Sequence, residues 1–313
     1  MNTLNRRDWL RVTGAAALGL PLVGYAAPDL RARARKNLKL GVFTGVYASL
    51  PLEEAARRIA ADGFHGVVLD YAFADVRFDP WAPDWDKARL ITRTLAKHDV
   101  KIVGLYGYYN VVDPDPARRQ RGEQRMQVLI ENWRQFGCPL ISTETGTFNE
   151  KSEWLESPEN GTEKAYQACR AALEKLTKAA KKTGAVISIE TYWRNVIDSI
   201  ARAQRILGDV SGLKLVMDPC NFYRKEDLAN MDPMLEEMFR CLRKKIVLAH
   251  AKDVKAAADG TDLPASGKGV LDYPLYLRLL AGLNRELFLV IEHLTLDDVP
   301  RARDYVLSQF EKI

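Results

Sequence analysis

The chain has 313 residues, of which 47% are hydrophobic and 28% charged, a balance typical of an ordinary globular protein. The formal net charge is +5, but many basic residues gather near the N-terminus and the rest of the chain shows no basic stripe. We therefore expect no nucleic-acid partner. The four cysteines are widely spaced and include no CxxC pair, which argues against a zinc knuckle or a dithiol redox motif.

Residues 1–27 are expected to be a targeting segment and are left out of the fold argument. Arg6 and Arg7 are followed, after one residue, by the bulky apolar pair Trp9 and Leu10. This arrangement resembles the twin-arginine export signal, which implies an exported, periplasmic protein.

A weakly apolar stretch rich in Gly and Ala follows over residues 12–25. It is too short and too mild for a transmembrane helix, which needs roughly 20 strongly apolar residues, so no stable membrane insertion is expected. Small residues before the bond after Ala26 favour cleavage there by a signal peptidase. Residues 28–37 are then expected to be a linker to a single domain over 38–313.

From residue 38 onward, short β-rich runs alternate with amphipathic helical stretches, as βαβ units require. The expected strands are Lys39–Thr44, Gly66–Asp70, Lys101–Tyr106, Leu140–Glu144, Val186–Glu190, Lys214–Asp218, Ile246–His250 and Leu287–Glu292. One of the helices between them is expected over Ala165–Lys182, ending at Gly184.

Eight such units over about 275 residues predict an α/β fold of the (β/α)8 TIM-barrel type. The structural alternative, a doubly wound open sheet, favours a Gly-rich turn after the first strand. The segment Thr44–Tyr47 has no such fingerprint.

The last four of the eight expected strands each end on an ionisable residue, and this pattern indicates a functional site. They end on Glu190, Asp218, His250 and Glu292, each after three to five apolar residues. Active sites of TIM barrels lie at these strand ends, where an unpaired charge beside the packed core is costly. A divalent cation would relieve the repulsion among the three carboxylates. Oxygen ligands with one imidazole suit Mn²⁺, Mg²⁺ or Co²⁺, and Zn²⁺ is also acceptable.

Several segments resemble one family of sugar enzymes. They are Ser188–Thr191, Met217–Asn221, His250–Asp253, Gly267–Tyr273 and Ile291–His293. They are similar to the xylose isomerase-like TIM-barrel superfamily, which contains sugar and sugar-phosphate isomerases and epimerases. The resemblance implies that Glu190, Asp218, His250 and Glu292 bind one divalent metal. It also implies that Glu190 and Glu292 act as catalytic acid and base on opposite faces of the substrate carbon.

The reaction implied is isomerisation or epimerisation of a sugar through a metal-stabilised enediolate. Export favours a free sugar or keto-sugar over a phosphorylated one. The residues expected to contact substrate are Glu144, Tyr106, Trp193, Asn221, Lys252 and Asp253. Asn221 stands where many epimerases of the family have a histidine. Asp253 is also a candidate for orienting His250 or Lys252 in place of contacting the substrate. Segments 145–162 and 255–269 are lid candidates.

Three alternatives remain open. The same half-reaction suits a metal-dependent lyase or hydrolase of 3-keto-glycosides, and a non-catalytic sugar-binding protein is a second possibility. An abasic-site endonuclease needs several histidines at strand ends, whereas this chain has four in total and His293 is expected to point away from the site. The partner expected is a small carbohydrate, and a homo-oligomer is the candidate assembly.

Overall fold

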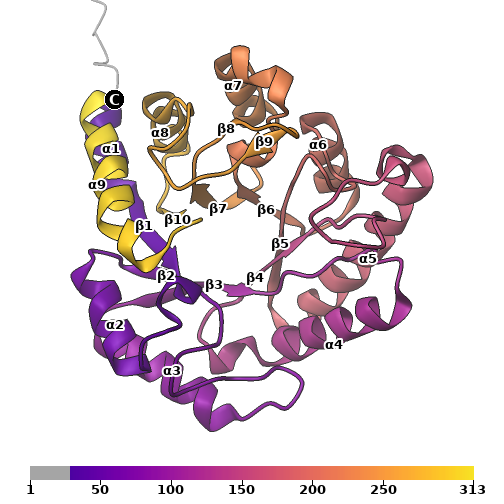
Figure 1. The fold of residues 1–313 in the computed structure, drawn as a ribbon. Coiled ribbons are helices and arrows are strands. Elements are labelled where there is room, and N and C mark those ends of the chain that lie inside the picture. Colours follow the sequence, from indigo (N-terminus) through magenta and orange to yellow (C-terminus); the bar gives the residue numbers. More distant parts are fainter. Residues whose placement is uncertain (1–28) are drawn as a thin grey trace, which may run out of the picture.

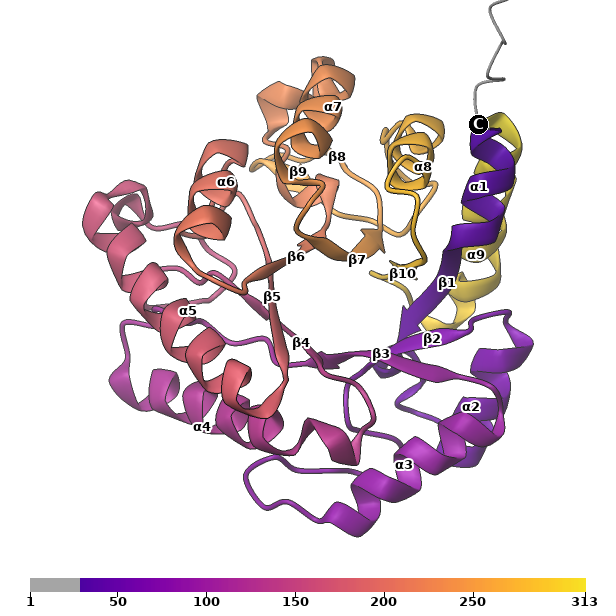
Figure 2. The same ribbon diagram turned by 180° about the vertical axis from the view of Figure 1, so that it is seen from behind.

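Eight parallel strands form a closed barrel in the computed structural model, which describes residues 29–313. Their order around the barrel is β1-β10-β7-β6-β5-β4-β3-β2, and a ring of helices surrounds them (Figure 1, Figure 2). The predicted single-domain (β/α)8 barrel is therefore confirmed. The expectations for the targeting segment lie outside the described residues.

The barrel strands begin and end within one residue of the predicted ranges. They are β1 (Leu38–Phe43), β2 (Gly66–Leu69), β3 (Lys101–Tyr106), β4 (Leu140–Glu144), β5 (Val186–Glu190), β6 (Lys214–Met217), β7 (Ile246–Ala251) and β10 (Leu287–Ile291). The barrel closes where β1 pairs with β10, from Leu38 opposite Leu287 to Val42 opposite Ile291. A short antiparallel hairpin, β8 (Lys255–Ala256) and β9 (Thr261–Asp262), follows β7.

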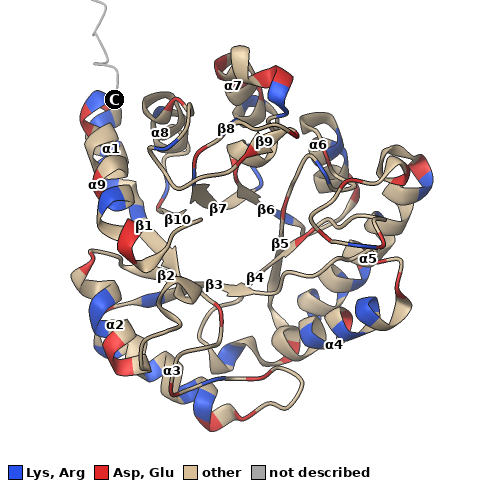
Figure 3. Ribbon diagram, viewed as in Figure 1, with Lys and Arg blue, Asp and Glu red and all other residues tan. Residues whose placement is uncertain are grey.

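The helices that cover the barrel bury one apolar face each. They are α2 (Leu52–Ala61), α3 (Trp85–Lys97), α4 (Pro116–Asn132), α5 (Glu163–Thr183), α6 (Ile200–Asp209), α7 (Met231–Leu242), α8 (Tyr273–Ala281) and α9 (Val299–Gln309). Short 3₁₀ turns are η1 (Thr44–Tyr47), η2 (Trp133–Gln135), η3 (Pro158–Gly161), η4 (Pro219–Asn221), η5 (Lys225–Ala229), η6 (Leu296–Asp298) and η7 (Phe310–Lys312). Charged residues of both signs lie along the outer helices (Figure 3).

Local sequence signals set the ends of α5. The Thr162 hydroxyl accepts a hydrogen bond from the Ala165 amide at 3.1 Å and caps the start of the helix. Gly184, with a φ of 81°, takes the left-handed conformation that ends it, as predicted. No helix in the part of the chain that the structure describes is long and apolar enough to cross a membrane.

The segment expected as a linker contains a helix, α1 (Leu30–Asn37). Asp29 caps it, and the Arg31 guanidinium donates to the Glu311 carbonyl at 2.6 Å, next to the C-terminus (Figure 1). Its charged sequence buries Ala34 alone, so it has little amphipathic pattern to read. Contacts with the far end of the chain hold this helix in place. The sequence of residues 30–37 does not indicate these contacts.

Candidate metal and substrate site

Four neighbouring strands of the barrel bring the candidate ligands together. β5, β6, β7 and β10 are consecutive around the barrel, and their C-terminal ends lie within one residue of Glu190, Asp218, His250 and Glu292. We call these four residues the carboxylate–histidine cluster. One potential ligand atom from each lies within 4.8 Å of the other three, and all four residues are buried. The set inferred from the sequence thus occupies one place in the structure.

The His250 imidazole lies at the centre of this cluster. Its Nδ1 is 3.4 Å from Glu190 Oε1, 3.5 Å from Asp218 Oδ2 and 3.5 Å from Glu292 Oε2. Neither ring nitrogen has a hydrogen-bond partner among the described residues. One buried imidazole nitrogen and three carboxylate oxygens, which face each other without a hydrogen bond to that nitrogen, are the ligand atoms typical of a divalent-cation site. The residues present therefore fit the metal expected.

The turn after β6 positions two residues of the site, Asp218 and Asn221. η4 begins directly after Asp218, whose Oδ1 accepts a hydrogen bond from the Cys220 amide at 3.1 Å. Asp218 Oδ2 is left to face His250. The same turn carries Asn221, whose Nδ2 donates to Glu190 Oε1 at 2.6 Å. The second oxygen of Glu190 accepts from the Tyr108 hydroxyl at 2.7 Å.

Lys252 brings a positive charge into the cluster. Its Nζ is 2.6 Å from Glu292 Oε1 and 2.8 Å from Asp218 Oδ2, and the residue is 3% exposed. Burial alone would lower the pKa of Lys252, but the surrounding carboxylates raise it well above its usual value. When His250 is neutral, as a metal-bound imidazole must be, three carboxylates and one ammonium leave a net charge of minus two, which a divalent cation would cancel.

Glu190 is also kept charged by neighbouring groups of opposite charge, which outweigh the effect of burial on its pKa. Burial would raise the pKa of this carboxyl, but the charges of His250 and Lys252 lower it to about 2. Glu292 behaves alike, since His250 and Lys252 outweigh its burial and hold its pKa well below the usual value. Both residues are therefore carboxylates at neutral pH.

Glu144 differs from the other carboxyl groups of the site. It ends β4 in register with Glu190, and no Lys, Arg or His of the described chain forms an ion pair with it. Burial, followed by the charge of Glu190, raises the pKa of Glu144 well above its usual value. We therefore read Glu144 as a protonated carboxyl that can donate a hydrogen bond to a substrate oxygen.

These residues face a cavity of about 520 Å³ at the mouth of the barrel. Of the predicted substrate residues, Tyr106, Glu144, Asn221 and Lys252 line it together with Glu190 and Glu292. Tyr108 also lines it, although the sequence favoured Tyr106 as the aromatic contact. The spacing of Tyr106 and Tyr108, two residues apart, was the signal that could have indicated both.

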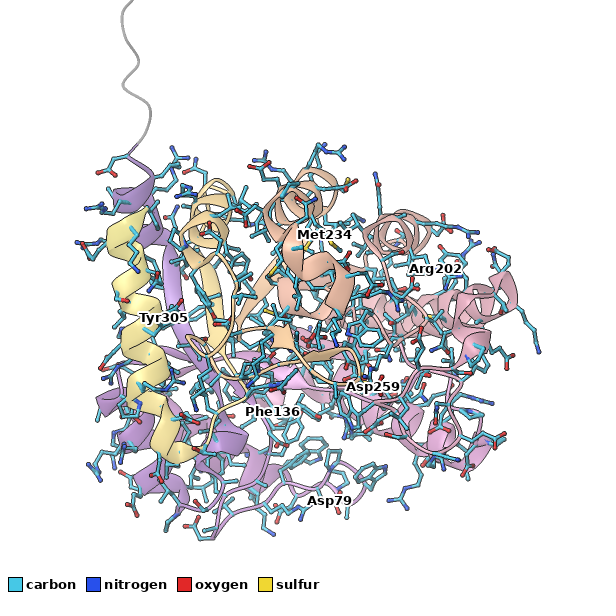
Figure 4. The ribbon with its side chains drawn as sticks, turned by 45° about the horizontal axis from the view of Figure 1, so that its top comes forward. Asp79, Phe136, Arg202, Met234, Asp259 and Tyr305 are labelled. Carbon is cyan, nitrogen blue, oxygen red and sulfur yellow. The ribbon has the colours of Figure 1, made fainter. Side chains whose placement is uncertain are left out.

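Trp193 does not line the cavity, contrary to expectation. Its Nε1 donates to Thr261 Oγ1 at 3.2 Å, and its ring packs against the guanidinium groups of Arg194 and Arg224. The chain leaves β5 after Glu190, so the alternation of a strand no longer fixes where Trp193 points. It supports the β8–β9 hairpin, whose turn contains Asp259 (labelled in Figure 4).

Asp253 is likewise a support for a loop and does not contact the cavity. Its carboxylate accepts hydrogen bonds from the backbone amides of Val254, Gly267 and Leu271 at 2.9–3.0 Å. The residue is fully buried by this loop. Among the described residues, Asp253 accepts no hydrogen bond from His250 or Lys252, so the structure does not show the orienting contact expected.

His293 lies on the cavity wall, although the sequence predicted that it would point away. Its φ of 57° is left-handed, which breaks the strand alternation directly after Glu292. Its Nδ1 bonds the carbonyl of Leu263 and so ties the end of β10 to the loop after the hairpin.

Two tyrosines of α8 fix the strand ends from outside the cavity. The Tyr276 hydroxyl lies 3.0 Å from the carbonyls of both Met217 and His250. The Tyr273 hydroxyl donates to the Lys252 carbonyl at 2.8 Å. The sequence does not indicate this role, because nothing in a helical pattern shows which hydroxyl reaches a strand end.

The closed barrel with this cluster at its mouth defines a TIM-barrel protein with a candidate metal centre. A family model described as xylose isomerase-like TIM barrel matches residues 56–307. The chain therefore belongs to the xylose isomerase-like TIM-barrel family. A search of curated proteins gave no match.

Solved structures share the fold at low sequence identity. A xylose isomerase domain protein from Planctomyces limnophilus has a TM-score of 0.67 at 17% identity, covering 88% of this chain and 98% of that one. The 3-keto-D-glucoside 4-epimerase from E. coli has a TM-score of 0.63 at 18% identity, with coverages of 88% and 100%. A xylose isomerase-like TIM-barrel protein from Mycobacterium smegmatis, in complex with magnesium, has a TM-score of 0.63 at 16% identity, with coverages of 89% and 98%.

Proposed function

We propose that this protein is a divalent-metal-dependent isomerase or epimerase of a free sugar or keto-sugar. The observation that carries the proposal is the pair Glu190 and Glu292. Both are carboxylates, both line one cavity, and both belong to a cluster whose net negative charge suits a divalent cation. The family membership supports the assignment, as do the epimerase and magnesium-bound structures named above.

Glu190, Asp218, His250 and Glu292 would hold the metal. When bound, a divalent cation polarises a substrate carbonyl and stabilises the negative charge that develops when a neighbouring proton is removed. Mn²⁺, Mg²⁺, Co²⁺ and Zn²⁺ all suit this donor set.

The chain supplies the proton transfers and the positioning. One of the two carboxylates takes a proton from the carbon beside the carbonyl. In isomerisation the same carboxyl group returns this proton to the next carbon, and in epimerisation the other carboxyl group delivers to the opposite face a proton that it has first taken from water. Tyr108 and Asn221 fix the two oxygens of Glu190, while Lys252 fixes Glu292. Glu144 is placed to donate a hydrogen bond to a sugar oxygen.

Deuterium exchange tests this proposal. The protein loaded with Mn²⁺ is incubated in D₂O with a panel of ketoses and keto-sugars, and NMR follows the carbon next to the carbonyl. We expect exchange with at least one sugar, and a loss of about a thousandfold or more in rate for Glu190→Gln and Glu292→Gln. Glu123→Gln, at an ion pair with Lys175 between outer helices, is the matched control. Binding without exchange in the whole panel would favour a non-catalytic sugar-binding protein.

A second reaction is favoured by the protonated state of Glu144. In a 3-keto-glycoside, removal of the proton at C2 can expel the anomeric oxygen, and that leaving oxygen must gain a proton. Glu144 has one to give, which suits a lyase or hydrolase of 3-keto-glycosides. Release of the leaving alcohol in the same assay, dependent on Glu144, would select this reaction over epimerisation.

The place of action is a separate proposal. The pair Arg6 and Arg7 supports export to the periplasm by the twin-arginine route. Replacing both with Lys should leave the protein in the cytoplasmic fraction, and unchanged fractionation would contradict export by this route.

A further inference from the structure

The cavity has a polar floor and an apolar rim. The floor consists of strand-end residues that are almost fully buried, among them Glu190 at 7% and Lys252 at 3% exposure. The rim consists of loop residues, above all Trp154, which is 51% exposed. The loop residues Val46, Leu263 and Leu294 line it as well. A sugar whose carbonyl reaches the floor therefore leaves the rim to whatever is attached to that sugar.

The size of the cavity exceeds what one sugar ring needs. A hexose displaces about six waters of about 30 Å³ each, or roughly 180 Å³. The cavity measures about 520 Å³. Pockets that bind small molecules usually enclose most of the ligand surface, so the additional space indicates a larger ligand.

Hydrogen bonds within its loop hold Trp154 in its exposed position. The Thr147 hydroxyl donates to the Leu155 carbonyl at 2.9 Å, and Asn149 Nδ2 donates to the Glu156 carbonyl at 2.9 Å. The loop is anchored further along by Arg202 of α6 (labelled in Figure 4), which donates to the Asn160 carbonyl at 2.6 Å. A binding platform that is already ordered costs little conformational entropy when a ligand stacks on it.

The charges around the cavity disfavour a phosphorylated ligand. In the part of the chain that the structure describes, Lys252 is the one Lys or Arg that lines the cavity. Its ammonium is already paired with Asp218 and Glu292 at the floor. A phosphate at the rim would find apolar side chains and the imidazole of His293, whose Nδ1 already bonds the Leu263 carbonyl, in place of the Arg or Lys that usually bind it.

We propose that the substrate is a glycoside, in which the reacting sugar ring occupies the floor and a second, uncharged ring stacks on Trp154. This inference rests on the proposed function and narrows its substrate class. Indole faces bind the apolar faces of sugar and aromatic rings, and the neighbouring aliphatic side chains complete the same surface.

Calorimetric titration tests the proposal with two probes, the methyl and phenyl glycosides of 3-keto-glucose, each in both anomeric forms. The protein is the full chain loaded with Mg²⁺. We expect one phenyl glycoside to bind about tenfold more tightly than its methyl counterpart, the factor that stacking of one ring typically provides. Trp154→Ala should remove this difference and leave the affinity for the methyl glycoside unchanged, and Trp154→Phe should keep most of it.

Leu155→Ala is the matched control, because Leu155 is the exposed neighbour in the same loop and does not line the cavity. It should keep the tenfold preference. Equal affinities of the native protein for methyl and phenyl glycosides, or a preference that survives in Trp154→Ala or is lost in Leu155→Ala, would overturn the inference. The exchange assay separates it from the proposed function. Deuterium exchange without a preference for the phenyl glycoside would reject only the inference that the substrate is a glycoside. A preference for the phenyl glycoside without deuterium exchange would reject only the proposed enzymatic activity.

Discussion

Lys252 has two roles at the scale of single residues, because its ammonium both balances and restrains the carboxylates of the site. It lies within 2.8 Å of Asp218 and Glu292, in a place where water cannot screen their repulsion. We therefore expect this ammonium to reduce the repulsion among the carboxylates when no metal is bound.

Lys252→Met should make the fold depend on the metal. Without the ammonium, the buried carboxylates repel each other, and the free energy of unfolding of the metal-free protein should fall by about 3–5 kcal/mol. Mg²⁺ should then raise the melting temperature of the variant more than that of the native protein. Thermal unfolding with EDTA or Mg²⁺ measures both.

The control for this change is Lys268→Met, which removes an exposed ion pair with Asp298. Its effect on the free energy of unfolding should stay within about 1 kcal/mol. Equal gains from Mg²⁺ in the native protein and in Lys252→Met would contradict the role assigned to Lys252.

Glu144 should make the metal-free protein less stable as the pH rises. Its pKa in the folded state is well above the usual value of 4.5, so the unfolded chain loses this proton first. That contribution to stability is complete at low pH and is lost progressively from about pH 5 upward. Glu144→Gln should thus gain in free energy of unfolding relative to the native protein between pH 5 and pH 8. A difference independent of pH in urea titrations with EDTA would show that Glu144 is ionised in the fold.

At the scale of elements, the loop after β7 depends on one buried carboxylate. Asp253 accepts three backbone hydrogen bonds that hold residues 264–271 over the strand end. Asp253→Ala leaves those amides without partners and should lower the free energy of unfolding by about 2–5 kcal/mol. Urea unfolding measures this loss. A loss below about 1 kcal/mol, with a large rise in KM alone, would instead support the substrate contact expected from the sequence.

Residues within the strands could be placed from the sequence, whereas residues in the loops after them could not. Strand periodicity fixes which side chains share a face, so Glu144, Glu190 and His250 could be placed from the sequence alone. Trp193, Asp253 and His293 follow the strand ends, where turns and a left-handed residue replace that periodicity. Their positions depend on loops that no local pattern describes.

At the scale of the whole molecule, the barrel explains why four residues spread over about a hundred positions form one site. Consecutive strands are neighbours, and their C-terminal ends face the same way, so a residue type repeated at strand ends becomes a ring of ligands. Helix α1 shows the limit of this reasoning. It is held by Glu311, at the other end of the chain, and its sequence alone indicates no packing partner.

The metal content of the purified protein tests whether the carboxylate–histidine cluster is a metal site. Purified native protein, equilibrated with Mn²⁺ and freed of excess metal, should retain one equivalent per chain by elemental analysis. His250→Ala, which removes the central ligand, should retain less than about a tenth of that, in line with the loss expected when a direct ligand is deleted. A native protein that holds no divalent metal, or a His250→Ala variant that holds as much as the native protein, would contradict the account.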